Sequence, residues 1–132
     1  MRHWRNLILA VMAAAVLAPG PAAAYVAWNN FTILRIGADR FEVLPRGGLN
    51  AIDGWCAVGD YVITVLSLDP ATPIWRISEP PRPRGASIVF SLGAEGAASA
   101  NGLMQIGSSH VWLTAAAARA FCPQSLSYWQ FL

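Results

Sequence analysis

The chain has no lysine, and charged residues make up only 12% of its 132 residues. Its nine basic residues are all arginine, set against seven acidic residues. Arg2 and Arg5 belong to an N-terminal segment that we expect to be removed, which leaves seven charges of each sign. Nucleic-acid binding depends on clustered positive charge that displaces counterions from phosphates. The sequence therefore argues against a nucleic-acid partner.

No apolar run is long enough to span a membrane. The longest, Leu7 to Ala18, has 12 residues and would rise about 18 Å as a helix, against a hydrocarbon core of roughly 30 Å. Pro19-Gly20-Pro21 ends this run, and Ala22 and Ala24 are small residues of the kind that signal peptidase recognises. We therefore interpret residues 1–24 as a signal peptide, with a retained membrane anchor as the alternative. The mature protein, 25–132, is expected in the periplasm or the medium, with no stable membrane span after cleavage.

Only two cysteines are present, Cys56 and Cys122, and they lie 66 residues apart, far from the close Cys-x-x-Cys spacing of redox sites. Outside the cytoplasm an even number of cysteines favours a disulfide. We therefore expect Cys56 and Cys122 to be bonded. In the chain-entropy model a loop of this size restricts the unfolded ensemble by about 4 kcal/mol.

The mature chain of 108 residues is the size of one domain. Five short runs are rich in β-branched and aromatic residues, which is typical of strands. They comprise residues 31–36, 40–44, 74–77, 86–92 and 103–106. Gly37-Ala38-Asp39 suits a hairpin between the first two, and Phe41 and Val43 should share a buried face. The prolines within 79–85 predict an exposed loop between the third and fourth strands.

Two segments are predicted to be helical. Residues 55–68 have apolar residues at helical spacing, and Asp53 before them is a reasonable N-cap. A strand beginning at Tyr61 is the alternative, but a run of this length favours a helix. Thr114 is expected to cap the alanine-rich segment 115–122. The order β-β-α-β-β-β-α predicts an α+β domain: a small antiparallel sheet of about five short strands with two helices, stapled by one disulfide.

The stretch Trp55-Cys56-Ala57-Val58-Gly59-Asp60-Tyr61 is followed by a hydrophobic run, by Ile-Trp-Arg and Ile-Val-Phe-Ser-Leu strands and by a late Phe-Cys pair. In this pattern the chain resembles a group of small exported proteins of unknown function from alphaproteobacteria that share a Trp-Cys-x-x-Gly-Asp-Tyr motif. The likeness covers most of the mature chain. It supports the helix over 55–67 and the disulfide, and it implies no activity, ligand or catalytic residue.

Catalytic and metal-binding groups are scarce. His110 is the single histidine of the mature chain and follows Ser108 and Ser109. A small hydrolase using His110 with one of these serines is the alternative function, although no Gly-x-Ser-x-Gly elbow accompanies them. We interpret His110 as a surface or capping residue. One histidine, two cysteines expected to be oxidised and scattered acids do not form a metal site, and no cofactor is expected.

Asp53 and Asp60 could be proposed as the paired carboxylates of a glycosidase. Seven residues on a helix separate them by roughly 10 Å along the axis, which is at the limit even for an inverting pair. We therefore interpret Asp53 as a cap and Asp60 as a solvated or tyrosine-bonded side chain.

An apolar segment, Tyr128–Leu132, follows the second predicted helix, in a position where polar residues are usual. We expect it to dock on the domain or to bind a partner. The sequence thus predicts a non-catalytic exported binding module for a protein, a peptide or an envelope component. Trp129 and Phe131 are its candidate binding residues.

Overall fold

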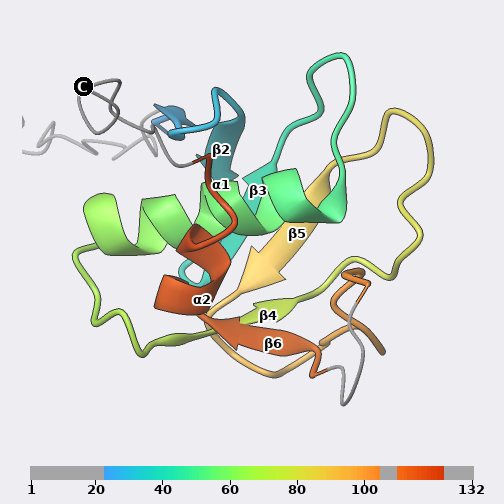
Figure 1. The fold of residues 1–132 in the computed structure, drawn as a ribbon. Helices are drawn as coiled ribbons and strands as arrows, with labels where there is room; N and C mark the ends of the chain where they lie inside the picture. Colours follow the sequence, from blue (N-terminus) through green and yellow to red (C-terminus); the bar gives the residue numbers. More distant parts are fainter. Residues whose placement is uncertain (1–22, 105–109, 124–132) are drawn as a thin grey trace, which may run out of the picture.

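A computed structural model describes residues 23–104 and 110–123. These residues form one antiparallel sheet of six short strands with two helices and a disulfide (Figure 1). The elements are β1 (Tyr25–Val26), β2 (Thr32–Arg35), β3 (Arg40–Val43), α1 (Ala51–Thr64), β4 (Pro73–Arg76), β5 (Ile88–Ser91), β6 (Trp112–Thr114) and α2 (Ala115–Arg119). The strand order is β1-β2-β3-β5-β4-β6. The predicted α+β class is confirmed.

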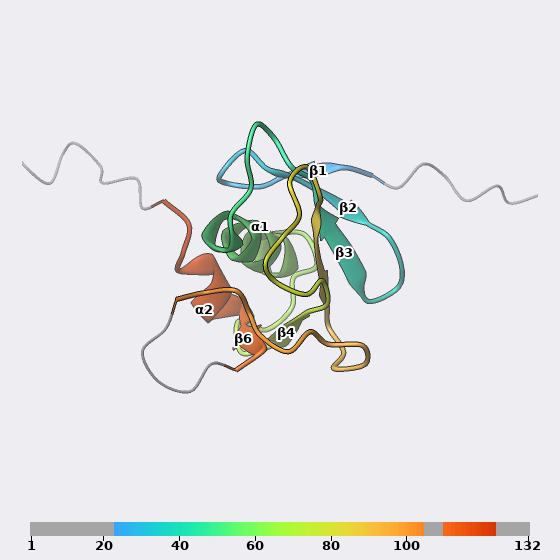
Figure 2. The ribbon, with the colours of Figure 1, turned by 90° about the vertical axis from the view of Figure 1, so that its right-hand side faces the viewer.

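The core lies between the sheet and α1, and both helices lie on the same side of β2 and β3 (Figure 2). Phe41 and Val43 on β3 are both fully buried, as their alternation predicts. They pair with Phe90 and Ile88 of β5, which share the same face. Trp55 on α1 packs edge-on against Phe90 with ring centroids 4.7 Å apart. This packing fixes α1 across the middle of the sheet.

The first helix begins earlier than the sequence suggests. Asn50, not Asp53, is the N-cap, and α1 runs from Ala51 to Thr64 rather than over 55–68. The Asn50 side chain accepts a hydrogen bond from the Asp53 backbone N–H, while the Asp53 carboxylate accepts one from the Asn50 N–H. This reciprocal capping box satisfies two N–H groups of the first turn, and so the helix starts one turn before Trp55.

The second helix is held against the first. Thr114 caps α2 by accepting a hydrogen bond from the Ala117 N–H, as predicted, but the helix ends at Arg119 rather than at residue 122. The expected disulfide is present: the sulfur atoms of Cys56 and Cys122 are 2.07 Å apart. The disulfide therefore ties the chain just after α2 to the second turn of α1.

Two strands differ from the prediction. Leu103 and Met104 are not in a strand, and residues 105–106 lie outside the described residues. Asn101 accepts a hydrogen bond from the Leu103 N–H through its side chain, and this local turn competes with strand geometry. The strand that pairs with β4 is β6, at Trp112–Thr114. The two-residue β1 was not predicted, and so the sheet has one more strand than expected among the described residues.

The connection between β4 and β5 is the exposed proline loop that the sequence predicts, with residues 83–85 at the surface. Among the described residues, no helix combines the length and the apolar character needed to cross a bilayer. Residues 1–22, most of the predicted signal peptide, lie outside the described residues, and their role stays a prediction.

Candidate functional site

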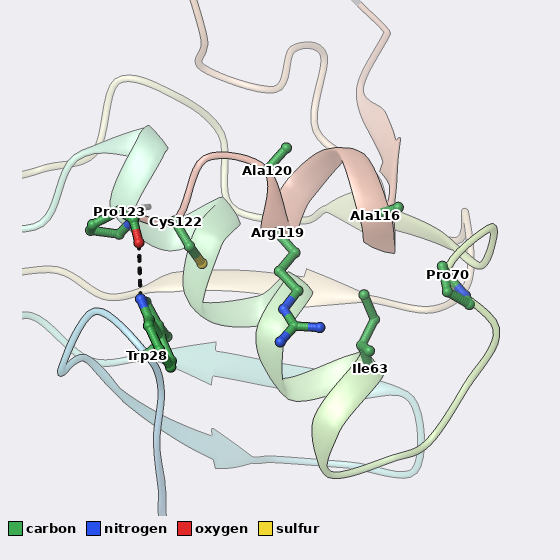
Figure 3. A pocket seen from close by; sticks show the side chains of 8 residues that line it. All are labelled: Trp28, Ile63, Pro70, Ala116, Arg119, Ala120, Cys122 and Pro123. Carbon is green, nitrogen blue, oxygen red and sulfur yellow. Dashed lines mark hydrogen bonds between the residues drawn. The ribbon is translucent and has the colours of Figure 1, made fainter. Parts of the chain in front are cut away.

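An open groove of about 470 Å³ lies over α1, between the N-terminal segment and α2. We call it the Trp28 groove. Figure 3 shows Trp28 at one end, Ile63 and Pro70 at the other, and the Arg119 guanidinium between them. The remaining lining residues are Ala116, Ala120, Cys122 and Pro123. Among the described residues that line it, Arg119 is the one with a charged side chain, and the others are apolar residue types.

Trp28 is exposed and yet fixed at two points. Its residue is 59% exposed. The indole Nε1–H donates to the carbonyl of Pro123 at 3.0 Å (Figure 3), and the Trp28 backbone N–H donates to Asp60 at 3.0 Å. An aromatic ring already held in one orientation loses little conformational entropy when a ligand packs against it. Trp28 therefore forms a preorganised wall of the groove.

Arg119 is the last residue of α2, and its side chain is 47% exposed. Its Nε atom lies 3.7 Å from an oxygen of Asp60, whose carboxylate is almost fully buried. The ion pair therefore occupies one edge of the guanidinium. Figure 3 shows the terminal nitrogens of Arg119 in the groove, between Trp28 and Ile63. A guanidinium held in this way can present its fork to a carboxylate.

Asp60 lies beneath Trp28 and Arg119 and contacts both of them. It is only 3% exposed, so the interpretation of Asp60 as solvated is wrong, whereas the alternative, a hydrogen bond with a tyrosine, is present with Tyr25. Its carboxylate accepts hydrogen bonds from the Tyr25 hydroxyl at 2.9 Å and the Thr64 hydroxyl at 3.0 Å, in addition to the Trp28 N–H. Burial raises the pKa of Tyr25, and its hydrogen bond to Asp60 raises that pKa further. The neutral phenol therefore serves as a donor to a buried carboxylate.

His110 lies away from this groove. It is exposed, its ring centroid is 5.6 Å from that of Trp112, and its carbonyl accepts a hydrogen bond from the Asn101 side chain. Within residues 23–104 and 110–123, no hydrogen bond joins its imidazole to a carboxylate. Ser108 and Ser109 lie outside the described residues, and so the hydrolase alternative stays a prediction.

Trp129 and Phe131, the binding residues that the sequence suggests, also lie outside the described residues. In the part of the chain that the structure describes, no group of three histidine, cysteine or acidic residues could hold a metal ion. A second cavity of about 400 Å³ is bordered by Ile52, Leu103 and Phe121, with apolar walls. The Trp28 groove is distinguished from it by a charged side chain.

Sequence reasoning missed Trp28 and Arg119, although both carry a recognisable signal. Trp28 precedes Asn29-Asn30, a pair suited to a turn, and Asn30 does adopt a positive φ of 67°. Arg119 is the one charged residue in an alanine-rich helix, and an isolated charge of this kind indicates a specific contact or a binding role. Comparison of the chain with family models, curated proteins and solved structures gives no match.

Proposed function

We propose that the protein is an exported binding module whose Trp28 groove holds a short peptide segment with an apolar side chain and a carboxylate. One observation carries the proposal: an exposed tryptophan, fixed at two points, and an arginine fork lie in the same open groove. No chemical step is required of these residues. The groove supplies surface and charge, which are the elements of recognition.

The apolar part of the ligand would pack against Trp28. The groove volume, about 470 Å³, falls within the range of ordinary ligand sites. An aromatic side chain that is fully covered buries roughly 150–250 Å². At about 25 cal/mol per Å² of apolar surface, half of that area contributes about 2–3 kcal/mol before the cost of association. This contribution favours peptides with a large apolar side chain over polar ones.

The anionic part of the ligand would meet Arg119. Because Asp60 is buried and lies behind the guanidinium, the groove face presents the cation rather than the carboxylate. A ligand carboxylate can accept two parallel N–H bonds from the terminal nitrogens, a geometry that a lysine cannot reproduce. A carboxylate next to an apolar group therefore describes the ligand class.

The disulfide supports an exported site. Cys122 lines the groove, and its bond to Cys56 holds the wall that carries Arg119 against α1. A groove that depends on a disulfide is best maintained in an oxidising compartment. This dependence agrees with the predicted signal peptide and with a site of action in the periplasm or the medium.

The test uses the oxidised mature protein, 25–132, and two small probes that differ in one charge. N-Acetyltryptophan carries a carboxylate, and N-acetyltryptophanamide does not. We expect the anionic probe to bind with a dissociation constant of about 1 mM or tighter and to shift the NMR signals of Trp28 and Arg119. The neutral probe should bind several-fold more weakly.

Matched variants assign the two contributions. Trp28→Ala should weaken both probes, whereas Arg119→Lys should mainly remove the preference for the anionic probe, because the charge stays but the fork is lost. Trp112→Ala and Arg35→Gln are the controls, since neither residue lines the groove. Equal binding of the two probes, or shifts that follow His110 and Trp112 instead, would contradict the proposal.

A further inference from the structure

We propose that the C-terminal segment of the same chain, residues 124–132, occupies the Trp28 groove until a ligand displaces it. We call this segment the tail. The inference rests on the proposed function of the groove, since the tail acts there as a built-in competitor. It also assigns a role to Trp129 and Phe131, whose apolar character is unusual outside a core.

The tail begins at the groove itself. Pro123 lines the groove, and its carbonyl is held by the Trp28 indole at 3.0 Å. The described part of the chain therefore ends at the rim of the groove, where Pro123 contacts Trp28 (Figure 3). A segment tethered by a short linker has an effective concentration of about 1 mM at its own site, which exceeds that of most free competitors.

The tail is long enough to cover the groove. The groove extends along α1 from the turn of Cys56, which is bonded to Cys122, to Ile63. Seven residues of helix correspond to about 10 Å. Residues 124–127 can span roughly 13 Å when extended. The aromatic residues that follow can therefore reach either end of the groove.

The chemistry of the tail also matches the groove. Its nine residues include three aromatic residues and no charged side chain, so docking buries no unpaired charge. Trp129 and Phe131 alternate with Gln130, and in an extended segment both rings face the same side. An aromatic face can stack on the Arg119 guanidinium through a cation–π contact. The side chains of the tail bring no carboxylate to the arginine fork, and a free ligand competes with the tail for the same aromatic wall and guanidinium.

The experiment compares the mature protein, 25–132, with a form truncated after Ser127. The truncation puts a new terminal carboxylate on Ser127, and the full-length double variant described next, which has no new terminus, controls for it. We expect N-acetyltryptophan to bind the truncated form about tenfold more tightly, because no tethered competitor remains. In the full-length mature protein, Trp129→Ser/Phe131→Ser should reproduce the gain, and Gln130→Ala should not.

The direct measurement is NMR titration of the truncated form with the amidated peptide 124–132. The Trp28 indole N–H signal, identified by its loss in Trp28→Phe, should shift, and added N-acetyltryptophan should reverse that shift. Shifts at Leu103 and Phe121 would place the tail in the second cavity and overturn the inference. A dimer that dissociates on truncation would also overturn it, because the tail would then occupy the groove of another copy.

The two proposals fail separately. If N-acetyltryptophan binds the full-length and truncated forms equally well at Trp28, the tail does not occupy the groove, while the proposed function stands. If the probe binds neither form but the amidated tail peptide still shifts Trp28, the tail docks as inferred, and the groove does not serve carboxylate ligands.

Discussion

Gly59 offers the sharpest test of how the two helices are packed. A Cβ atom added at Gly59 would lie 2.5 Å from the Arg119 backbone nitrogen and 2.9 Å from the Ala118 Cβ. These neighbours belong to the backbone of α2 or are attached directly to it, and they cannot rotate away. Gly59→Ala therefore forces α2 to move as a unit, by about 1 Å if an ordinary contact near 3.5 Å is to be restored.

Two opposing effects set the change in the free energy of unfolding of Gly59→Ala. In a helix interior, replacing glycine by alanine normally stabilises by about 1 kcal/mol. Here the displacement also disturbs Ala115 and Ala118, both fully buried, and overpacking of this kind costs about 1–3 kcal/mol or more. Because the disulfide limits how far α2 can retreat, we expect the upper part of that range. The net loss is about 1–2 kcal/mol, or roughly 5–15 °C in melting temperature for a domain of this size.

The assay is urea and thermal unfolding of the oxidised mature protein at neutral pH, with Gly54→Ala as the matched control. A Cβ at Gly54 would meet the Ile88 Cδ1 atom at 3.0 Å and the Phe90 Cζ atom at 3.3 Å, which are outer atoms of side chains that can adjust. We expect Gly54→Ala to change stability by less than about 1 kcal/mol. The packing argument is refuted if Gly59→Ala is as stable as the parent, or if Gly54→Ala loses more stability than Gly59→Ala.

Three further predictions concern stability. Replacing Cys56 and Cys122 together by alanine should lower the free energy of unfolding by about 4 kcal/mol in urea titrations, and no change would mean that the bond restrains nothing. The raised pKa of Tyr25 favours the neutral phenol in the folded state, so its contribution is complete below its ordinary pKa of 10.0 and is lost as the pH rises through the higher folded value. Tyr25→Phe should accordingly flatten the alkaline loss of stability, measured by urea midpoints from about pH 8 to pH 11. Hydrogen bonds from the Ser99 side chain and backbone lower the pKa of Glu79, so its contribution is complete above its ordinary pKa of 4.5 and is lost as the pH falls. Glu79→Gln should remove that part of the acid transition. An unchanged dependence of stability on pH would exclude a contribution from Glu79.

The features that the sequence predicts correctly are those encoded locally. Phe41 and Val43 alternate with charged residues, and period-2 alternation is sufficient to place a half-buried strand. Thr114 precedes four alanines, which is a cap followed by the strongest helix formers. The even number of cysteines and the expected compartment together predict the disulfide. Each of these signals lies within a few residues or requires no knowledge of the fold.

The features that were missed depend on distant residues. Asp60 is buried because Tyr25, Trp28 and Arg119 converge on it from segments that are far apart in the chain. The residues next to Asp60 in the sequence do not indicate these partners. The three-residue strand β6 has too few positions to show a period, and it forms because Ile74 and Trp75 of β4 pair with it. The burial of Asp60 and the strand β6 therefore depend on contacts between residues far apart in the chain, which the sequence pattern does not show.

The motif around Cys56 has a physical explanation in the groove. Cys56, Gly59, Asp60 and Ile63 are spaced at i, i+3, i+4 and i+7 along α1, and residues with this spacing share one face of a helix. Trp55 and Tyr61 point instead toward Phe90 and Phe41 in the core. The helix thus has one face for the sheet and another for α2 and the N-terminal segment.

Each position on that second face has a separate task. Cys56 ties down the chain after α2, Gly59 lets α2 approach closely, and Asp60 holds both Trp28 and Arg119 in the groove. Each task requires a different kind of residue at its position: a cysteine, a glycine and a carboxylate. Stability alone could be met by an apolar stripe at these positions. A bond, a gap and a buried charge on this face instead fix the relative positions of Trp28 and Arg119, which is what the proposed binding groove requires.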